Sequence, residues 1–173
     1  PSRRDSRFAN SGIVVTVDQA VFGDQPLDGM AYQSMIERAA FDAGGGRFVA
    51  PAQRTTDFVA GRVSASLPDC SYRPGLASVD LAAVLPERIW RPLRDALAYF
   101  DARRMRGYLS EESVLVGVES RSSAPVRLPR DPVGLESLGT TGLYPCGEGP
   151  GYAGGIMSAA LDGLRVAEAI GRA

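Results

Sequence analysis

Apolar side chains recur at three- and four-residue spacing in three stretches of this chain, and this spacing predicts three helices. The first helix is predicted from Pro26 to Asp42 and ends before the glycines at 44–46. The second runs from about Pro86 to Arg104, and the third covers residues 156–170. Pro92 lies inside the second stretch, so a kink or a break into two helices is expected there.

The third helix is predicted to begin near Gly154 or Gly155 and to be rich in small residues. Its spacing predicts one apolar packing face. The residues of that predicted face are Ile156, Ala159, Ala160, Leu164, Ala167 and Ile170.

Runs of β-branched residues bounded by polar residues, glycine or proline predict strands between the helices. The predicted strands and extended pieces are residues 12–17, 48–51, 113–119, 125–129 and 142–146. A short helical turn is expected from Thr55 to Ala60, ending at Gly61, and the proline-containing stretch 63–76 is expected to be a loop. The mixture of helices and strands predicts an α+β fold.

A glycine-rich stretch precedes the third helix and is the strongest candidate for a binding site. Residues 147–155 contain five glycines and one carboxylate, that of Glu148. Glycines let a ligand approach the main chain, and the first amides of the following helix are unpaired donors at the positive end of the helix dipole. The alternative is a plain loop between a short strand and a packing helix. The acid between two glycines favours the binding interpretation.

The composition excludes several classes of function. The chain has 173 residues with 20 acidic and 19 basic side chains, all of the latter arginines, and this balance argues against a nucleic-acid-binding surface. Because there is no histidine or lysine, Ser-His-Asp triads, histidine metal sites and lysine Schiff bases are excluded. Cys70 and Cys146 lack metal-ligand spacing, so no metal site is expected. No P-loop or nucleophile elbow occurs either.

Apolar runs are too short to cross a membrane, and the N-terminal segment lacks the apolar core of a signal peptide. A cytoplasmic protein without a membrane partner is therefore expected.

The segment Leu143-Tyr-Pro-Cys-Gly-Glu-Gly-Pro-Gly-Tyr-Ala-Gly-Gly-Ile-Met-Ser-Ala-Ala-Leu-Asp-Gly-Leu164 resembles the C-terminal signature of the bacterial FAD-dependent dehydrogenases. These proteins belong to the broad group of two-dinucleotide-binding flavoproteins. The segments 119–128, 2–12 and 50–53 are also similar to this family, so the resemblance covers nearly the whole chain.

The resemblance implies a role for each part of the glycine-rich stretch. The carboxylate of Glu148 would meet the ribityl and pyrophosphate part of FAD, and the following helix would direct its N-terminus at the flavin pyrimidine ring. The turn at Arg121 would border the flavin, where this guanidinium could stabilise negative charge. Alternatively, its serines bond their own backbone. The residues expected to bind FAD are Gly147, Glu148, Gly149, Gly151, Tyr152, Ala153, Gly154, Gly155, Ile156, Arg121, Ser122 and Ser123.

The N-terminal arginines leave two interpretations open. By resemblance, Arg3, Arg4 and Arg7 would meet an anionic substrate or the FAD phosphates. A solvated basic segment is the equal alternative.

One expected motif is missing: no Gly-x-Gly-x-x-Gly fingerprint for the adenosine half of FAD occurs. The chain is therefore expected to be the C-terminal portion of a longer enzyme whose complete fold is α/β. Residues 1–11 are expected to be a connecting loop, 12–110 a helix-rich insert of substrate-domain type, and 111–173 the closing strands and last helix of a Rossmann-like FAD domain. The missing N-terminal region is the expected partner.

The predicted function is an FAD-dependent oxidoreductase of unknown substrate, with catalytic residues unassigned. This portion alone is expected to be inactive, to bind FAD weakly and to expose apolar surface that favours self-association. The alternative is a non-enzymatic nucleotide- or partner-binding module that uses the glycine-rich loop as an anion cradle. A Gly-x-Gly-x-x-Gly upstream in the reading frame, or flavin absorbance, would separate the two.

Overall fold

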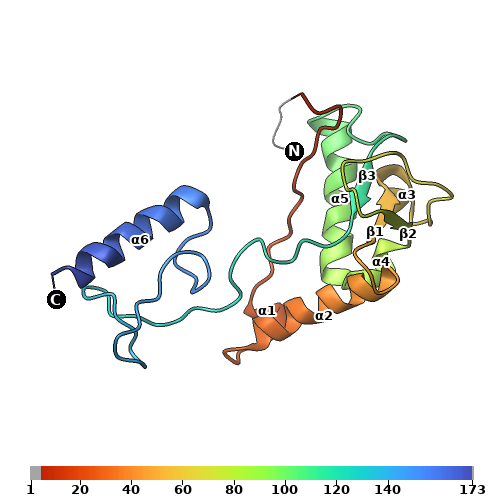
Figure 1. Cartoon of the computed structure of the whole chain (residues 1–173). Helices are drawn as coiled ribbons and strands as arrows, with labels where there is room; N and C mark the ends of the chain where they lie inside the picture. The colour runs from red at the N-terminus through yellow and green to blue at the C-terminus, as the bar shows by residue number, and fades with distance from the viewer. Residues whose placement is uncertain (1–4, 173) are drawn as a thin grey trace. The chain divides into compact units, whose positions relative to one another are not determined.

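The fold is α+β, as predicted from the alternation of helical and extended patterns. Figure 1 shows a computed structural model of the chain, which describes residues 5–172; Arg3 and Arg4 lie outside them. The elements of the described part are the helices α1 (Gln19–Phe22), α2 (Asp28–Ala43), α3 (Thr55–Ala60), α4 (Leu81–Val84), α5 (Glu87–Arg103) and α6 (Ile156–Ile170), and the strands β1 (Ala50–Arg54), β2 (Leu76–Ser78) and β3 (Val114–Val116).

The contacts divide the described residues into two compact units. The first unit comprises residues 5–17 and 34–118, and the second comprises residues 18–33 and 119–172. None of the helices in the described part is long and apolar enough to cross a membrane.

The sheet of the first unit has β1 at its centre. β1 runs parallel to β2, with Ala50 opposite Leu76, and antiparallel to β3, with Ala52 opposite Val116. Although Pro51 lies in this central strand and has no N–H to donate, its carbonyl accepts the amide of Gly117 at 2.6 Å. The proline therefore sits where the ladder to β3 ends.

The core of the first unit joins α3, α4 and α5. Phe58 and Leu97 are fully buried and Leu81 is 4% exposed, so one apolar side chain from each helix meets in the centre. Gln53 of β1 is also fully buried; its Nε2 donates to the carbonyl of Arg62 at 2.7 Å and its Oε1 accepts the amide of Leu81 at 3.0 Å. The side-chain amide of Gln53 thus bonds inside the protein and fixes the loop at Arg62 and the start of α4 to the sheet.

Four predicted helical stretches are confirmed as α2, α3, α5 and α6, with small changes at some of their ends. α2 begins two residues later than predicted, and α3 spans the predicted residues and ends with Gly61 in the left-handed conformation (φ 70°). α5 was expected to kink or break at Pro92. The predicted break was wrong, because the helix continues from Glu87 to Arg103. The side chain of Pro92 is exposed, so its ring points away from the core that the helix covers.

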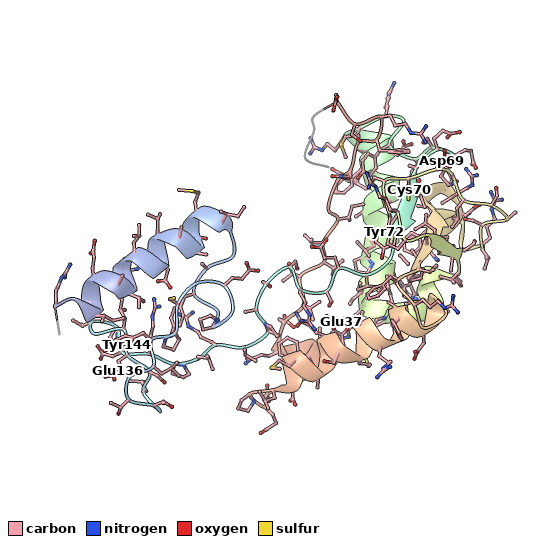
Figure 2. All side chains as sticks on the ribbon, viewed as in Figure 1. Glu37, Asp69, Cys70, Tyr72, Glu136 and Tyr144 are labelled. Atoms are coloured by element: carbon pink, nitrogen blue, oxygen red, sulfur yellow. The ribbon has the colours of Figure 1, made fainter. Side chains whose placement is uncertain are left out.

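The loop predicted at 63–76 is confirmed, apart from its last residue, which begins β2. Figure 2 labels Asp69, Cys70 and Tyr72 in this loop. The hydroxyl of Tyr72 donates to the carbonyl of Phe48 at 2.7 Å, and Asp69 forms an exposed ion pair with Arg7 at 2.8 Å. Arg7 is thus engaged with a carboxylate of its own unit.

Three predicted strands do not form. Residues 12–17, 125–129 and 142–146 lie outside the sheet, whereas 113–119 shortens to β3 and 48–51 shifts to β1. The proline rings at 125, 129 and 145 remove backbone donors, and Gly142 adopts a left-handed φ of 77°. An isolated antiparallel bridge between Arg130 and Ser137 is the pairing that this region retains.

The predicted packing face of α6 was wrong. Ile156 is 90% exposed and Leu164 62%, whereas Asp162 and Val166 are buried. The side of α6 that carries Asp162 and Val166 therefore faces its own unit, where a neighbouring loop places Arg130. The large apolar side chains point away from this loop.

Candidate functional site

Residues 147–152 of the glycine-rich stretch fold into a tight loop, which we call the glycine loop. The amide of Gly151 donates to the carbonyl of Glu148 at 2.9 Å, and the amide of Tyr152 donates to the carbonyl of Gly147 at 3.0 Å. Gly147 and Gly151 have φ angles of 78° and 84°, which other residues rarely adopt. The glycines at these two positions are therefore required by the turn itself.

The glycine loop is fastened to the segment 126–130. The carbonyl of Pro150 accepts the amide of Leu128 at 3.2 Å, and the hydroxyl of Tyr152 donates to the carbonyl of Leu128 at 2.9 Å. A Cβ at Gly151 would lie 2.6 Å from the carbonyl oxygen of Val126. Close approach of two backbones thus holds the loop in place.

A buried ion pair joins the glycine loop to α6. Arg130 donates to both carboxylate oxygens of Asp162, at 2.9 and 2.6 Å, and also to the carbonyl of Pro145 at 2.6 Å. The amide of Gly147 donates to the same carboxylate at 2.9 Å. The two side chains are only 5% and 8% exposed, so Asp162 connects the segment at 130, the start of the loop and the helix.

The electrostatics of this pair follow from its geometry. The hydrogen bonds from Arg130, aided by the amide of Gly147, lower the pKa of Asp162 from its ordinary value of 3.8 to about 2 against the opposing effect of burial. The same pairing raises the pKa of Arg130. Both groups are therefore charged at neutral pH.

The roles of Arg130 and Asp162 were not predicted from the sequence. A signal was present: Asp162 is one acid on the helix face that also carries Ala159 and Val166, three and four residues away. An acid on such a face needs a buried cation as its partner. The pattern does not identify which arginine supplies it.

The N-terminus of α6 offers backbone donors beside the glycine loop. Gly155 is the N-cap residue, and its amide donates to the hydroxyl of Ser158 at 3.1 Å. The amides of Ile156 and Met157 have no acceptor within the helix, and both residues are exposed. Positive potential and unpaired donors therefore face open space at this point.

The groups around the glycine loop can be compared with those that FAD would need. A Cβ added at Gly149 or Gly154 would meet nothing within 4 Å, so the backbone is open to close approach. Glu148 is exposed, and within residues 5–172 its carboxylate has no side-chain or backbone partner. Ala153 is half-buried between these open positions. An open backbone, a free acceptor and unpaired donors suit a cofactor that carries ribityl hydroxyls and, on its flavin ring, hydrogen-bond acceptors, so the chemistry of these residues fits FAD.

Arg121, Ser122 and Ser123 were also predicted to belong to the site. All three are exposed. Their turn is held by α2, since Nε2 of Gln33 donates to the carbonyls of Ser120 at 3.0 Å and Ser123 at 3.4 Å. The fixed contacts of the glycine loop instead run to residues 126–130 and to α6. The structure thus assembles residues 147–156 as one compact group, and the contribution of the turn at 121–123 stays a prediction.

Tyr152 has a structural role in addition to its predicted one. Its ring lies 3.6 Å from the guanidinium carbon of Arg130 and 4.4 Å from that of Arg127. A second acid in this region, Glu136, accepts the amide of Gly142 at 2.6 Å, and Figure 2 labels it together with Tyr144. Aromatic stacking and turn hydrogen bonds thus order the chain around the glycine loop.

Comparison with known proteins identifies relatives of this chain. Residues 1–122 match the family described as FAD-dependent protein, C-terminal domain-like. An uncharacterized protein of Clostridium beijerinckii is 46% identical over 170 residues, which cover 96% of this chain and 32% of that protein. The chain therefore spans about a third of the length of this relative. The family match ends before the glycine loop begins.

Proposed function

We propose a function from one premise: the chain belongs to the FAD-dependent protein, C-terminal domain-like family. The proposed function is to supply the ribityl and flavin side of the FAD site in an oxidoreductase of the dehydrogenase type. The observation that carries this proposal is the unpartnered carboxylate of Glu148, next to open glycine backbone and the N-terminus of α6.

In this proposal the residues of the site bind and orient the cofactor. Glu148 accepts hydrogen bonds from the ribityl hydroxyls, which are charge-assisted and therefore strong. The donors toward the flavin ring are the amides of Ile156 and Met157, since the amide of Gly155 is already bonded to Ser158. Bound FAD supplies the hydride chemistry.

The rigidity of the site supports the same function. A cofactor site must hold the residues that contact the ligand in a fixed geometry. Hydrogen bonds from the residues behind them maintain that geometry. Asp162 and Arg130 provide this support without reaching the proposed ligand, because both are buried behind the glycine loop. They are positioning residues.

The exposed apolar side chains of α6 suggest where the remainder of the FAD site would come from. Met157 is 71% exposed and Leu161 56%, beside Ile156 and Leu164. Contiguous apolar surface of this kind marks an interface. The occupant we propose is the nucleotide-binding region of a polypeptide with the length of the Clostridium relative, of which this chain covers 32%. By itself the chain would then bind FAD weakly.

The test is FAD retention by the protein expressed from its complete natural coding sequence. Glu148→Ala is expected to weaken FAD binding ten- to a hundredfold, as the loss of about 1.4 to 2.8 kcal/mol implies. Glu148→Gln keeps one acceptor and is expected to be milder. Glu112→Ala removes another exposed acid and serves as the matched control.

Flavin content and dissociation constant are measured for all four proteins. If Glu148→Ala retains FAD as the parent does, the carboxylate is only a surface acid and the assignment of the glycine loop to the ribityl chain is wrong.

A further inference from the structure

A cavity of about 590 Å³ lies beside the segment 127–135 within the second unit. Its charged and aromatic lining consists of Arg127, Arg130, Arg165, Asp162 and Tyr152, and Leu135 and two prolines complete the wall. A volume of this size accommodates a small organic molecule. Apart from Tyr152, none of the residues proposed to bind FAD lines it.

The cavity carries two positive charges in excess. Arg130 and Asp162 neutralise each other in a bidentate pair and are almost completely buried. Arg127 and Arg165 are exposed, and neither forms an ion pair within residues 5–172. Two guanidinium groups therefore remain available to a ligand.

The structure positions both arginines beside the cavity and orients one of them. The guanidinium of Arg127 stacks on the ring of Tyr152 at 4.4 Å, and the hydroxyl of that tyrosine is held by the carbonyl of Leu128 at 2.9 Å. Arg165 follows Asp162 by three residues on α6, so both side chains lie on the same side of the helix. Because Arg127 is oriented before binding, its side chain loses less entropy when a ligand binds.

We propose that this cavity binds a small molecule that carries a phosphate group. Arginine presents a planar fork of donors that matches phosphate oxygens, and a phosphate monoester places two negative charges on one group. The two charges equal the excess positive charge of the cavity. The apolar wall formed by Leu135 and the prolines would contact the organic part of the ligand.

The experiment is a calorimetric titration of the intact chain with inorganic phosphate, pyrophosphate and, as a carboxylate comparison, succinate. Saturable phosphate binding is expected in the millimolar range or tighter, and it should weaken when salt is raised because the arginines are exposed. Arg127→Gln and Arg165→Gln are each expected to weaken binding at least fivefold. Arg88→Gln removes an exposed arginine of α5 and should bind as the parent does.

Far-ultraviolet circular dichroism of each variant establishes that it is folded. The proposal is overturned if phosphate binding does not saturate, if both cavity variants bind as Arg88→Gln does, or if succinate binds more tightly than phosphate. No flavin is added, so this result is independent of FAD binding. A chain that binds phosphate while Glu148→Ala leaves FAD retention unchanged would contradict the proposed function alone.

Discussion

At the scale of single residues, Asp162 determines whether the glycine loop and α6 stay together. Its carboxylate accepts two hydrogen bonds from the guanidinium of Arg130 and one from the amide of Gly147, and the side chain is 8% exposed. A buried carboxylate with three charge-stabilising donors is costly to protonate or replace.

The first prediction concerns pH. Because the pKa of Asp162 is about 2 in the folded chain against an ordinary 3.8, its contribution to stability is complete above about pH 4 and is lost as the pH falls toward 2. The difference corresponds to about 2 kcal/mol. About 1 kcal/mol of this contribution should be lost between pH 7 and pH 3. Urea unfolding at the two pH values measures this loss as the difference between the parent and Asp162→Asn, which removes the titrating carboxylate.

Asp162→Asn should destabilise the second unit by about 3 to 5 kcal/mol at pH 7, since it leaves Arg130 buried without its partner. Glu168→Gln breaks an exposed pair with Arg172 and should cost less than about 1 kcal/mol. Equal effects of the two variants would show that the buried pair does not hold the site.

The second prediction compares two glycines of the loop. Gly151→Ala should destabilise by about 1 to 3 kcal/mol, because φ is 84° and the new Cβ would lie 2.6 Å from the carbonyl oxygen of Val126. Gly149→Ala has open space and should change stability little. Thermal unfolding of both variants provides the comparison, and a neutral Gly151→Ala would contradict the loop geometry.

At the scale of elements, helices were predicted well and strands poorly, for physical reasons. Helical spacing is local, so α2, α5 and α6 could be located from their own residues. A strand needs a partner, and the β-branched run at 12–17 finds none in the sheet. β2 has only three residues and acquires its structure by pairing with β1. Which face of α6 is buried also depended on a partner, Arg130, that is remote in sequence.

The third prediction concerns the helix that was expected to break. Pro92 cannot donate to the carbonyl of Arg88 inside α5, so Pro92→Ala should restore this hydrogen bond and stabilise the first unit by about 1 kcal/mol. The gain is partly offset by greater freedom of the unfolded chain. Pro86→Ala, at the N-cap, is the matched control and should give no gain. Equal midpoints in urea for Pro92→Ala and the parent would contradict this account of α5.

At the scale of the whole chain, resemblance indicated the bacterial FAD-dependent dehydrogenases before any geometry was known. The family match over residues 1–122 confirms the coarser part of this prediction, a C-terminal domain of FAD-dependent proteins. The sequence located the glycine loop because its glycines serve both the turn and the open surface. It did not reveal the ion pair at Asp162 or the cavity at Arg127, because each joins residues that are distant along the chain. The division into a connecting loop at 1–11, a helix-rich insert at 12–110 and an FAD-domain portion at 111–173 stays a prediction.

The central claim is that open backbone at the N-terminus of α6 receives the flavin. Gly155 tests it most directly, because its φ is −160°, which any residue adopts, and a Cβ there would meet only the hydroxyl of Ser158 at 3.7 Å. Gly155→Val should therefore fold, with a loss of at most about 1 kcal/mol from the weaker N-cap. Gly139→Val, at another open glycine, is the control.

The measurement is the FAD dissociation constant of Gly155→Val in the protein expressed from its complete natural coding sequence. The thermal stability of the FAD-free protein is measured in parallel. The account predicts a loss of FAD affinity greater than that of Glu148→Ala, while stability stays within about 1 kcal/mol of the parent. Unchanged FAD affinity in Gly155→Val would contradict the account.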